Sequence, residues 1–392
     1  MLKQELTSRV KSLQDSIISN QLDCYVVATE ANIWYLSAVS YHPEERPFFI
    51  IVAPGEKPIM VVPFMEEAHL HKTVLDCTII SYWEYPSPEG SNWYEVLDKV
   101  INKYKRVGVE PNIPTDMFMK IAAGKAVTID LVGELRMTKS PYELEAIRKT
   151  AAICDTAMAS IMSSAYYGAS VVESFALSKT VQNDLIRSRD FDPITTSLLT
   201  AVWPAPISAM PHSIPGLADK LTKGPNVAMS YFRINGYAAE CERTFFLSDP
   251  DDEMKTCFND MMEARNIALK TLKAGVPCSA VDTAAKNLLI KKGYKENLLH
   301  RTGHGIGMGN HEQPWLAEGS TDILAENMVV SIEPGIYIGQ VGGYRHSDTV
   351  LVTKTGYELI TKFPTDLAGL IVKSANRMAK LKGSLIRKAL KL

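Results

Sequence analysis

Two glutamates stand close together in the segment 229–246, MSYFRINGYAAECERTFF. The segment is typical of two strands joined at Asn235 and Gly236, a pair that favours a two-residue type I′ turn. Because side chains alternate along a strand, one face of such a hairpin carries both acids, and Ser230 and Cys241 point to the other face. In that register the facing pairs are Met229 with Glu242 and Tyr231 with Glu240.

This pair of acids has two interpretations. Ionised carboxylates so close repel each other, so they are tolerated on a solvent-exposed face, where water screens them. Alternatively they are retained because a cation, a cationic substrate or a metal must be held between them. The hairpin alone leaves both interpretations open.

Four other segments carry residues suited to chemistry. Glycines around a histidine let the backbone pass close to a ligand, and an acid inside an apolar strand is costly unless it is paired or functional. A single histidine in such a place is more often structural than catalytic, but so many features in one region indicate a site. They are His304 and His311 in HRTGHGIGMGNHEQPW (300–315), Glu333 in MVVSIEPGIYI (328–338), His212 in AMPHSIP (209–215), and Arg345 with Asp348 in GGYRHSDTVLV (342–352).

The composition excludes several classes of function. The chain is 46% hydrophobic with a formal net charge of −2, which argues against a nucleic acid or another polyanion as partner. Its 6 cysteines include no C-x-x-C pair, so we expect reduced thiols in a cytoplasmic protein rather than a disulfide frame or a zinc site. The N-terminus is typical of a charged amphipathic helix, and no apolar run is long enough to predict a membrane span.

The elements that must position these residues follow from the hydrophobic periodicity. The first third alternates β-rich runs at 24–28, 48–52, 58–62, 77–82 and 106–110 with helical patterns at 64–73, 91–104 and 115–124, which predicts an α/β domain. A helix from Pro141 to about residue 163 follows, because Ser140 and Glu143 form a capping-box pattern. Beyond it, helices at 170–188, 252–273 and 278–292 and strands at 226–234, 237–247, 328–337 and 348–353 predict an α+β domain.

The motifs together resemble the pita-bread superfamily of prolidases, aminopeptidase P, methionine aminopeptidases and creatinase. The order PHS, NGY-x-x-E-x-ERTFF, GHGIG, HE-x-P, SIEPGIY and GGYR-x-x-DTVLVT carries the resemblance, and LRMTKSPYELEAIRKTA (135–151) looks like the junction between their domains. The implied fold is an α+β pita-bread catalytic domain at 138–372, after a smaller creatinase-type α/β domain at 1–137. A basic tail at 373–392 completes the chain; its expected form is a solvated helix end, with a contact to an anionic surface as the alternative.

In the peptidases of this superfamily, two metal ions are bound by two Asp, one His and two Glu. Carried over by the resemblance, these ligands fall on Met229, Glu240, His304, Glu333 and Ser347. A thioether and a hydroxyl are poor ligands for hard divalent ions, so the resemblance implies no dinuclear site. We therefore expect no cofactor, with a single divalent metal on Glu240, His304 and Glu333 as the alternative.

The departures resemble creatinase and the similar ectoine hydrolases, which lack the metal ligands. Glu242-Arg243-Thr244 matches their Glu-Arg-Thr. The resemblance implies that His212 transfers the proton and that Glu242 and Glu333 hold the substrate. It also implies that Arg46, which precedes a proline, reaches the site of a partner subunit in a homodimer. The creatinase arginine for the substrate carboxylate falls on Trp315, which argues against creatine itself. The other expected substrate-binding residues are Met229, Tyr231, Glu240, His304, His311 and Arg345.

Three functions remain open at this point. The first is a metal-independent hydrolase of a C–N bond in a small cationic or amidine-type substrate, with histidine as general base because no metal acidifies the water. The second is an Xaa-Pro dipeptidase with a mononuclear metal site. The third is a catalytically silent pita-bread protein that binds a ligand or partner.

Overall fold

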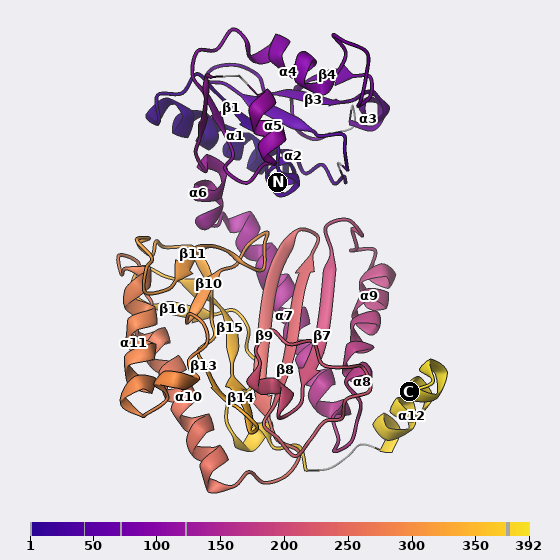
Figure 1. The fold of residues 1–392 in the computed structure, drawn as a ribbon, viewed down its shortest axis with the longest axis vertical. Helices are drawn as coiled ribbons and strands as arrows, with labels where there is room; N and C mark the ends of the chain where they lie inside the picture. The colour runs from indigo at the N-terminus through magenta and orange to yellow at the C-terminus, as the bar shows by residue number, and fades with distance from the viewer. Residues whose placement is uncertain (1, 43, 71–72, 122–123, 374–376) are drawn as a thin grey trace. The chain divides into compact units, whose positions relative to one another are not determined.

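The computed structural model describes residues 2–42, 44–70, 73–121, 124–373 and 377–392. The chain forms two compact units, Met1–Arg136 and Met137–Leu392, so the division falls one residue before the boundary expected from the sequence. Mixed helices and sheets in both units agree with the predicted fold class (Figure 1). Among the described residues, no helix combines the length and the apolar character that crossing a membrane requires.

The N-terminal unit is built on a six-stranded mixed sheet in the order β4-β3-β2-β1-β5-β6. Every residue of β1, β2 and β5 is buried, which explains their uninterrupted apolar sequences. The strands are Cys24–Val27 (β1), Phe49–Val52 (β2), Ile59–Pro63 (β3), Thr78–Tyr82 (β4), Val107–Val109 (β5) and Ala126–Thr128 (β6). The helices are Leu2–Ser19 (α1), Glu30–Ser37 (α2), Phe64–Leu70 (α3), Trp93–Ile101 (α4), Thr115–Lys120 (α5) and Leu131–Met137 (α6).

All five strands predicted for this unit are present. The sequence did not predict α2, α6 or β6, which are short or lack a clear period. The predicted helices 64–73 and 115–124 extend over residues 71–72 and 122–123, which lie outside the described residues.

The second unit holds an eight-stranded sheet and a separate hairpin. The sheet order is β11-β10-β12-β15-β9-β8-β7, with β16 paired to β15, and β13 pairs with β14. The strands are Ser197–Trp203 (β7), Asn226–Ile234 (β8), Tyr237–Phe245 (β9), Gly303–Gly305 (β10), Glu312–Leu316 (β11), Val329–Ile332 (β12), Gly335–Ile338 (β13), Gly342–Arg345 (β14), Ser347–Val352 (β15) and Tyr357–Leu359 (β16). The longer helices are Pro141–Ser164 (α7), Val171–Phe175 (α8), Leu177–Ser188 (α9), Asp252–Thr271 (α10), Cys278–Lys291 (α11) and Arg377–Leu390 (α12).

Helix α7 begins at the capping box that the sequence predicts. The Glu143 amide donates to Ser140 Oγ over 3.2 Å, and the Ser140 amide donates to Glu143 Oε2 over 3.1 Å. The helix lies behind the strands β7–β9 in Figure 1. Ser230 Oγ donates to the carbonyl of Cys154 on this helix, over 3.0 Å. One face of the central hairpin is therefore fixed against α7, and the opposite face is left for the site.

The register of the β8–β9 hairpin is the one predicted. Met229 faces Glu242 and Tyr231 faces Glu240. Asn235 and Gly236 have φ values of 47° and 88°, as a type I′ turn requires.

The predicted strand 328–337 is instead two strands. β12 ends at Ile332 and joins the large sheet, whereas β13 begins at Gly335 and pairs with β14. Glu333 and Pro334 lie at the break, because proline cannot donate to a ladder and redirects the chain. Glu333 therefore lies between two strands and not inside one continuous apolar strand.

The basic C-terminal segment includes α12, which packs against helices α7 and α8 of the same unit. Arg387 forms an ion pair with Glu173 of α8 and donates to Tyr166 Oη over 3.0 Å. The segment is therefore held by specific side chains, at least through this helix; residues 374–376 of the predicted tail lie outside the described residues.

Candidate active site

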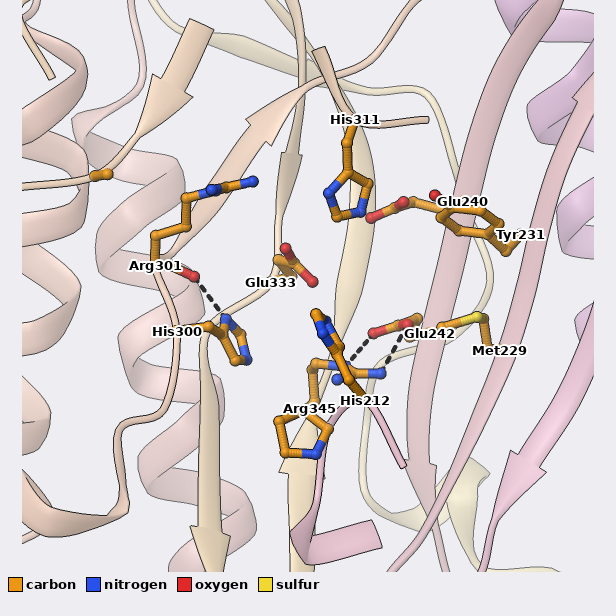
Figure 2. Close-up of a pocket in the computed structure, with 12 residues that line it drawn as sticks. His212, Met229, Tyr231, Glu240, Glu242, His300, Arg301, His311, Glu333 and Arg345 are labelled. Atoms are coloured by element: carbon orange, nitrogen blue, oxygen red, sulfur yellow. Dashed lines mark hydrogen bonds and ion pairs between the residues drawn. The ribbon is translucent and has the colours of Figure 1, made fainter. Parts of the chain in front are cut away.

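A cavity of about 370 Å³ lies on the free face of the β8–β9 hairpin. Its walls combine carboxylates, histidines and arginines (Figure 2). The lining residues are Pro211, His212, Met229, Tyr231, Glu240, Glu242, His300, Arg301, His311, Ala317, Glu333 and Arg345. Eight of the eleven residues predicted for the site belong to this lining, and His304 lies buried beside it.

Elements far apart in the sequence supply these side chains. Strands β8 and β9 provide the hairpin residues, and the break after β12 provides Glu333. Arg345 ends β14, His304 lies in β10, and His311 precedes β11. His212 comes from the loop after a short 3-10 turn, Ile207–Ala209. The fold of the second unit thus brings together segments that the sequence separates by more than a hundred residues, as for Glu242 and Arg345.

Glu240 is held by two serine hydroxyls. Its Oε1 accepts a hydrogen bond of 2.6 Å from Ser331 Oγ on β12 and another of 2.6 Å from Ser347 Oγ on β15. Burial raises the pKa of Glu240 and the charge of Glu333 adds to this, whereas His304 and the two hydroxyls oppose it. Ser347, to which the resemblance assigns a metal ligand of the peptidases, therefore stabilises the Glu240 carboxyl group through its hydroxyl.

His304 and His311 form a stacked pair next to this carboxylate. Their ring centroids are 3.7 Å apart at an interplanar angle of 22°. His304 Nδ1 lies 3.1 Å from the carbonyl of Gly305, so this nitrogen carries the proton and donates it. His304 Nε2 then points to the acids, 3.2 Å from Glu333 Oε1 and 3.8 Å from Glu240 Oε1. Neither contact has hydrogen-bond geometry, so Nε2 is a buried nitrogen without a hydrogen-bond partner.

The surroundings strongly shift the pKa values of His304, His311 and Glu333. Burial disfavours the charged form of His304, but Glu240 and Glu333 outweigh it and raise the pKa of His304 to about 9. Burial and the charge of His304 lower the pKa of His311 to about 4. Burial opposes ionisation of Glu333, but His304 lowers the pKa of Glu333 to about 2. At neutral pH the metal-free protein therefore has a His304 imidazolium beside the Glu333 carboxylate, with the neutral imidazole of His311 stacked on its face.

Glu242 makes an ion pair within the protein. Its two oxygens accept from Arg345 Nε and, over 3.0 Å, from Arg345 Nη2, and both side chains are buried (Figure 2). Burial raises the pKa of Glu242 to about 7, against the opposing effect of Arg345. The sequence analysis expected this carboxylate to hold a substrate cation, but a guanidinium of the protein itself already occupies that position. Met229 lies beside the pair, where a carboxylate would compete for Arg345.

Comparisons with known proteins agree with this architecture. The model of metallopeptidase family M24 matches residues 145–354, and that of the creatinase/prolidase N-terminal domain matches residues 9–138. The chain belongs to metallopeptidase family M24. Membership in this family supports the expectation of a hydrolase that acts on C–N bonds.

The most similar proteins cover nearly the whole chain. An uncharacterised peptidase from Staphylococcus aureus strain MRSA252 is 26% identical over 362 residues, which are 91% of this chain and 99% of that protein. Dipeptidase PepE from Mycobacterium ulcerans has a similar structure, with a TM-score of 0.82, 22% identity and coverage of 95% of this chain and 100% of that one. A recombinant prolidase from Thermococcus sibiricus gives a TM-score of 0.79 with 25% identity and covers 92% and 97% of the two chains.

The M24 site of this chain fits one metal ion and does not fit two. Ligand atoms of Glu240, His304 and His311 all lie within 4.8 Å of one another. The Gly305 carbonyl orients His304 so that Nε2 is the free nitrogen, which is how proteins fix a metal-binding imidazole. Among the described residues a second ion has no comparable ligand set: the positions to which the resemblance assigns two further acids hold Met229 and Ser347, and Glu242 is paired with Arg345. The expectation of a cofactor-free site is therefore not supported, and His311 joins the ligands that the sequence analysis named.

Two cavity residues of this M24 domain, His300 and Arg301, were missed by the sequence analysis. His300 Nδ1 donates to the Arg301 carbonyl over 2.7 Å, so its Nε2 accepts from Tyr337 Oη, also over 2.7 Å. Tyr337 Oη in turn accepts from Arg345 Nη1 over 3.2 Å. Both residues lie within three positions of the GHG motif at 303–305, and that position was the signal that could have found them.

Two predicted residues lie elsewhere. Trp315 is absent from the cavity lining, and its ring lies beneath the Arg301 guanidinium, 4.3 Å from the guanidinium carbon. Arg46 belongs to the N-terminal unit, where it forms ion pairs with Glu84 at 2.5 Å and Glu45 at 2.6 Å. Its role toward a partner subunit stays a prediction.

Proposed function

We propose that this protein is a peptidase-type hydrolase that cleaves the amide bond of a small substrate and uses no more than one divalent metal ion. Glu240, His304 and His311 would hold the ion, and Glu333 lies beside them. This is close to the second function left open by the sequence. The names of the similar proteins favour it over a creatinase-like activity, since they include a prolidase and a dipeptidase.

One observation carries the proposal. Three ligand atoms from β9, β10 and the segment before β11 converge within 4.8 Å, and the nitrogen among them on His304 is buried without a hydrogen-bond partner. In the metal-free protein the charges of Glu333 and Glu240 face this nitrogen at 3.2 Å and 3.8 Å, and a bound cation would take the place of its proton between the same groups. Three protein ligands with an open position are also the usual arrangement of a catalytic site.

The chemistry divides between the ion and the side chains. A divalent ion supplies a Lewis acid for the scissile carbonyl and lowers the pKa of a water molecule. His212 lines the cavity, and in the part of the chain that the structure describes its imidazole has no hydrogen-bonding partner, so it is free to take and return a proton. Arg345 favours the charged form of Glu242 and holds its carboxyl group in the cavity wall through two hydrogen bonds.

A metal-independent hydrolase remains the second candidate. It is favoured by Met229 and Ser347, at the positions to which the resemblance assigns two metal ligands, and by the guanidinium of Arg345, which binds Glu242 across from Met229. In that case His212 acts as the general base on an ordinary water molecule. The pairing of Glu242 weakens this candidate, because the carboxylate proposed to hold a substrate cation is occupied.

Metal analysis combined with a substrate panel tests the proposal. We expect up to one equivalent of divalent metal per chain, and hydrolysis of Xaa-Pro dipeptides that a chelator abolishes and added metal restores. Two tightly held equivalents would refute the mononuclear site. Chelator-insensitive hydrolysis of creatine or ectoine would establish the second candidate instead, and no turnover by the metal-loaded protein would indicate the non-catalytic alternative.

A further inference from the structure

The two arginines of the cavity differ in their pairing. Arg345 uses Nε and Nη2 on Glu242 and Nη1 on Tyr337, so its donors are committed inside the protein. The guanidinium of Arg301 has no hydrogen bond or ion pair with any residue that the structure describes, and its Nε is buried. Of the two arginines that line the cavity, Arg345 is therefore paired with an acid and Arg301 is not.

Arg301 is held in place by an aromatic ring rather than by an acid. Its guanidinium carbon lies 4.3 Å from the centroid of Trp315, close enough for a cation–π contact. In Figure 2 the guanidinium extends into the cavity above Glu333 and toward His311. Its charge is one of the causes of the low pKa of His311, although burial and His304 act more strongly. Stacking occupies a face of the guanidinium and leaves its edge free for donation.

The nearby acid does not neutralise this cation. Glu333 is the carboxylate that Figure 2 shows closest to Arg301, but it pairs with His304, whose Nε2 lies 3.2 Å from Glu333 Oε1. A partly buried guanidinium without an acceptor is costly, because it has lost water without gaining a hydrogen bond. Such a group is retained where a ligand supplies the missing anion, and the planar guanidinium fork matches a carboxylate in particular.

We propose that Arg301, supported by Trp315, is a subsite for a carboxylate group of the substrate. The substrate is then a small acid or zwitterion, with its carboxylate on Arg301 and the scissile bond near Glu240, His304 and His311. This inference rests on the proposed function for the position of the scissile bond, but the carboxylate subsite itself is independent of hydrolysis. It also gives Trp315 a role, as the platform that positions Arg301.

Binding of matched acids and amides tests this subsite without turnover. The probes are N-acetylglycine, L-proline and Ala-Pro, each compared with its C-terminal amide by calorimetry on the chelator-treated full-length protein. We expect the wild type to bind the acids about 10- to 100-fold more tightly than the amides, as for a charge-assisted bidentate pair. Arg301→Met should remove this preference and Arg301→Lys should keep part of it. Arg187→Met should leave it unchanged, since Arg187 is exposed and lies outside the lining residues.

Each outcome decides the inference. Loss of the acid preference in Arg301→Met, with an unchanged melting temperature and unchanged amide binding, supports the subsite. A wild type with no preference for acids, or an Arg301→Met variant that keeps the preference, overturns it. If the acids are preferred but Ala-Pro is not hydrolysed by the metal-loaded enzyme, the proposed function fails and the carboxylate subsite stands.

Discussion

At the scale of single residues, each of the three carboxyl groups in the cavity is stabilised by different partners. Glu240 accepts two serine hydroxyls, Glu333 faces the His304 imidazolium, and Glu242 binds Arg345. Three acids so close cannot all ionise without such partners. In the metal-free protein the His304 imidazolium and Arg345 supply the positive charges that face Glu333 and Glu242.

Removing Arg345 should expose the cost of burying Glu242. We expect Arg345→Met to lower the free energy of unfolding by about 3 kcal/mol, because an uncompensated buried charge remains. Without Arg345 the pKa of Glu242 rises further, so the folded variant binds a proton and its stability falls as pH increases from about 5 to above 7. Denaturant unfolding across that pH range is the measurement.

A second pair of variants makes this test specific. Glu242→Gln combined with Arg345→Met should be more stable than Arg345→Met alone, since no buried charge is left. Arg148→Met removes a similar but half-exposed pair with Glu358 and should cost less than about 1 kcal/mol. Equal losses in Arg345→Met and Arg148→Met would show that the Glu242 pair is no more important than a surface pair.

His212 is the residue we expect to transfer the proton. His212→Ala should lower kcat on the best substrate by about 100-fold or more while KM changes little, as for loss of a general acid or base. Because His212 makes no hydrogen bond with the described residues, the melting temperature should be unchanged. Retention of kcat in the folded variant would assign the proton transfer to another group.

At the scale of elements, the hairpin shows which features the sequence could predict. The Asn-Gly turn and the strict alternation of side chains determine the facing pairs, so the positions of Met229 and Glu242 follow from local rules. The capping box of Ser140 and Glu143 is equally local. Each of these depends on neighbours within a few residues along one or two strands.

The pairings that decide the chemistry are not local. Arg345 reaches Glu242 because β15 pairs with β9, with Ser347 opposite Glu242, although about a hundred residues separate the strands. Arg301 lies on Trp315 only because β10 pairs with β11, with His304 opposite Trp315. Local periodicity carries no information on such pairings. For this reason the sequence predicted a substrate-binding role for Glu242 and no role for Arg301.

The attachment of β15 to the rest of the domain gives a prediction about acid stability. Asp348 in β15 is buried and forms ion pairs with Arg243 on β9 at 2.8 Å and Arg265 on α10 at 2.5 Å. Burial opposes its ionisation, but the two arginines lower the pKa of Asp348 to about 2. A depressed pKa stabilises the fold above the unfolded value near 4, and that contribution, about 2 kcal/mol, is lost as pH falls from about 4 to about 2.

Asp348→Asn isolates this contribution. The variant should be about 3 kcal/mol less stable at neutral pH, since two buried guanidiniums lose their anion. Its stability should also change less than that of the wild type between pH 4 and pH 2. Asp184→Asn, which removes an exposed pair with Arg187, serves as the control and should behave like the wild type. A wild-type pH dependence in Asp348→Asn would refute the assignment.

At the scale of the whole molecule, the described residues that line the cavity all belong to the second unit, Met137–Leu392. Nevertheless the similar proteins match along both units, and dipeptidase PepE aligns over 95% of this chain. Since the second unit supplies these lining residues, the N-terminal unit is available for contacts between subunits. We expect a homodimer in which Arg46 of each subunit acts at the site of its partner.

Mixed dimers test that role of Arg46 directly. Arg46→Ala removes only half-exposed ion pairs with Glu45 and Glu84, so the fold should be retained. If Arg46 acts across the interface, Arg46→Ala and His212→Ala chains are each inactive alone, but their heterodimer contains one intact site. Random co-assembly should then restore about a quarter of the wild-type activity, because half of the dimers are mixed and each has one working site. No recovery in a proven heterodimer, or a monomer by light scattering, would place any function of Arg46 within its own subunit.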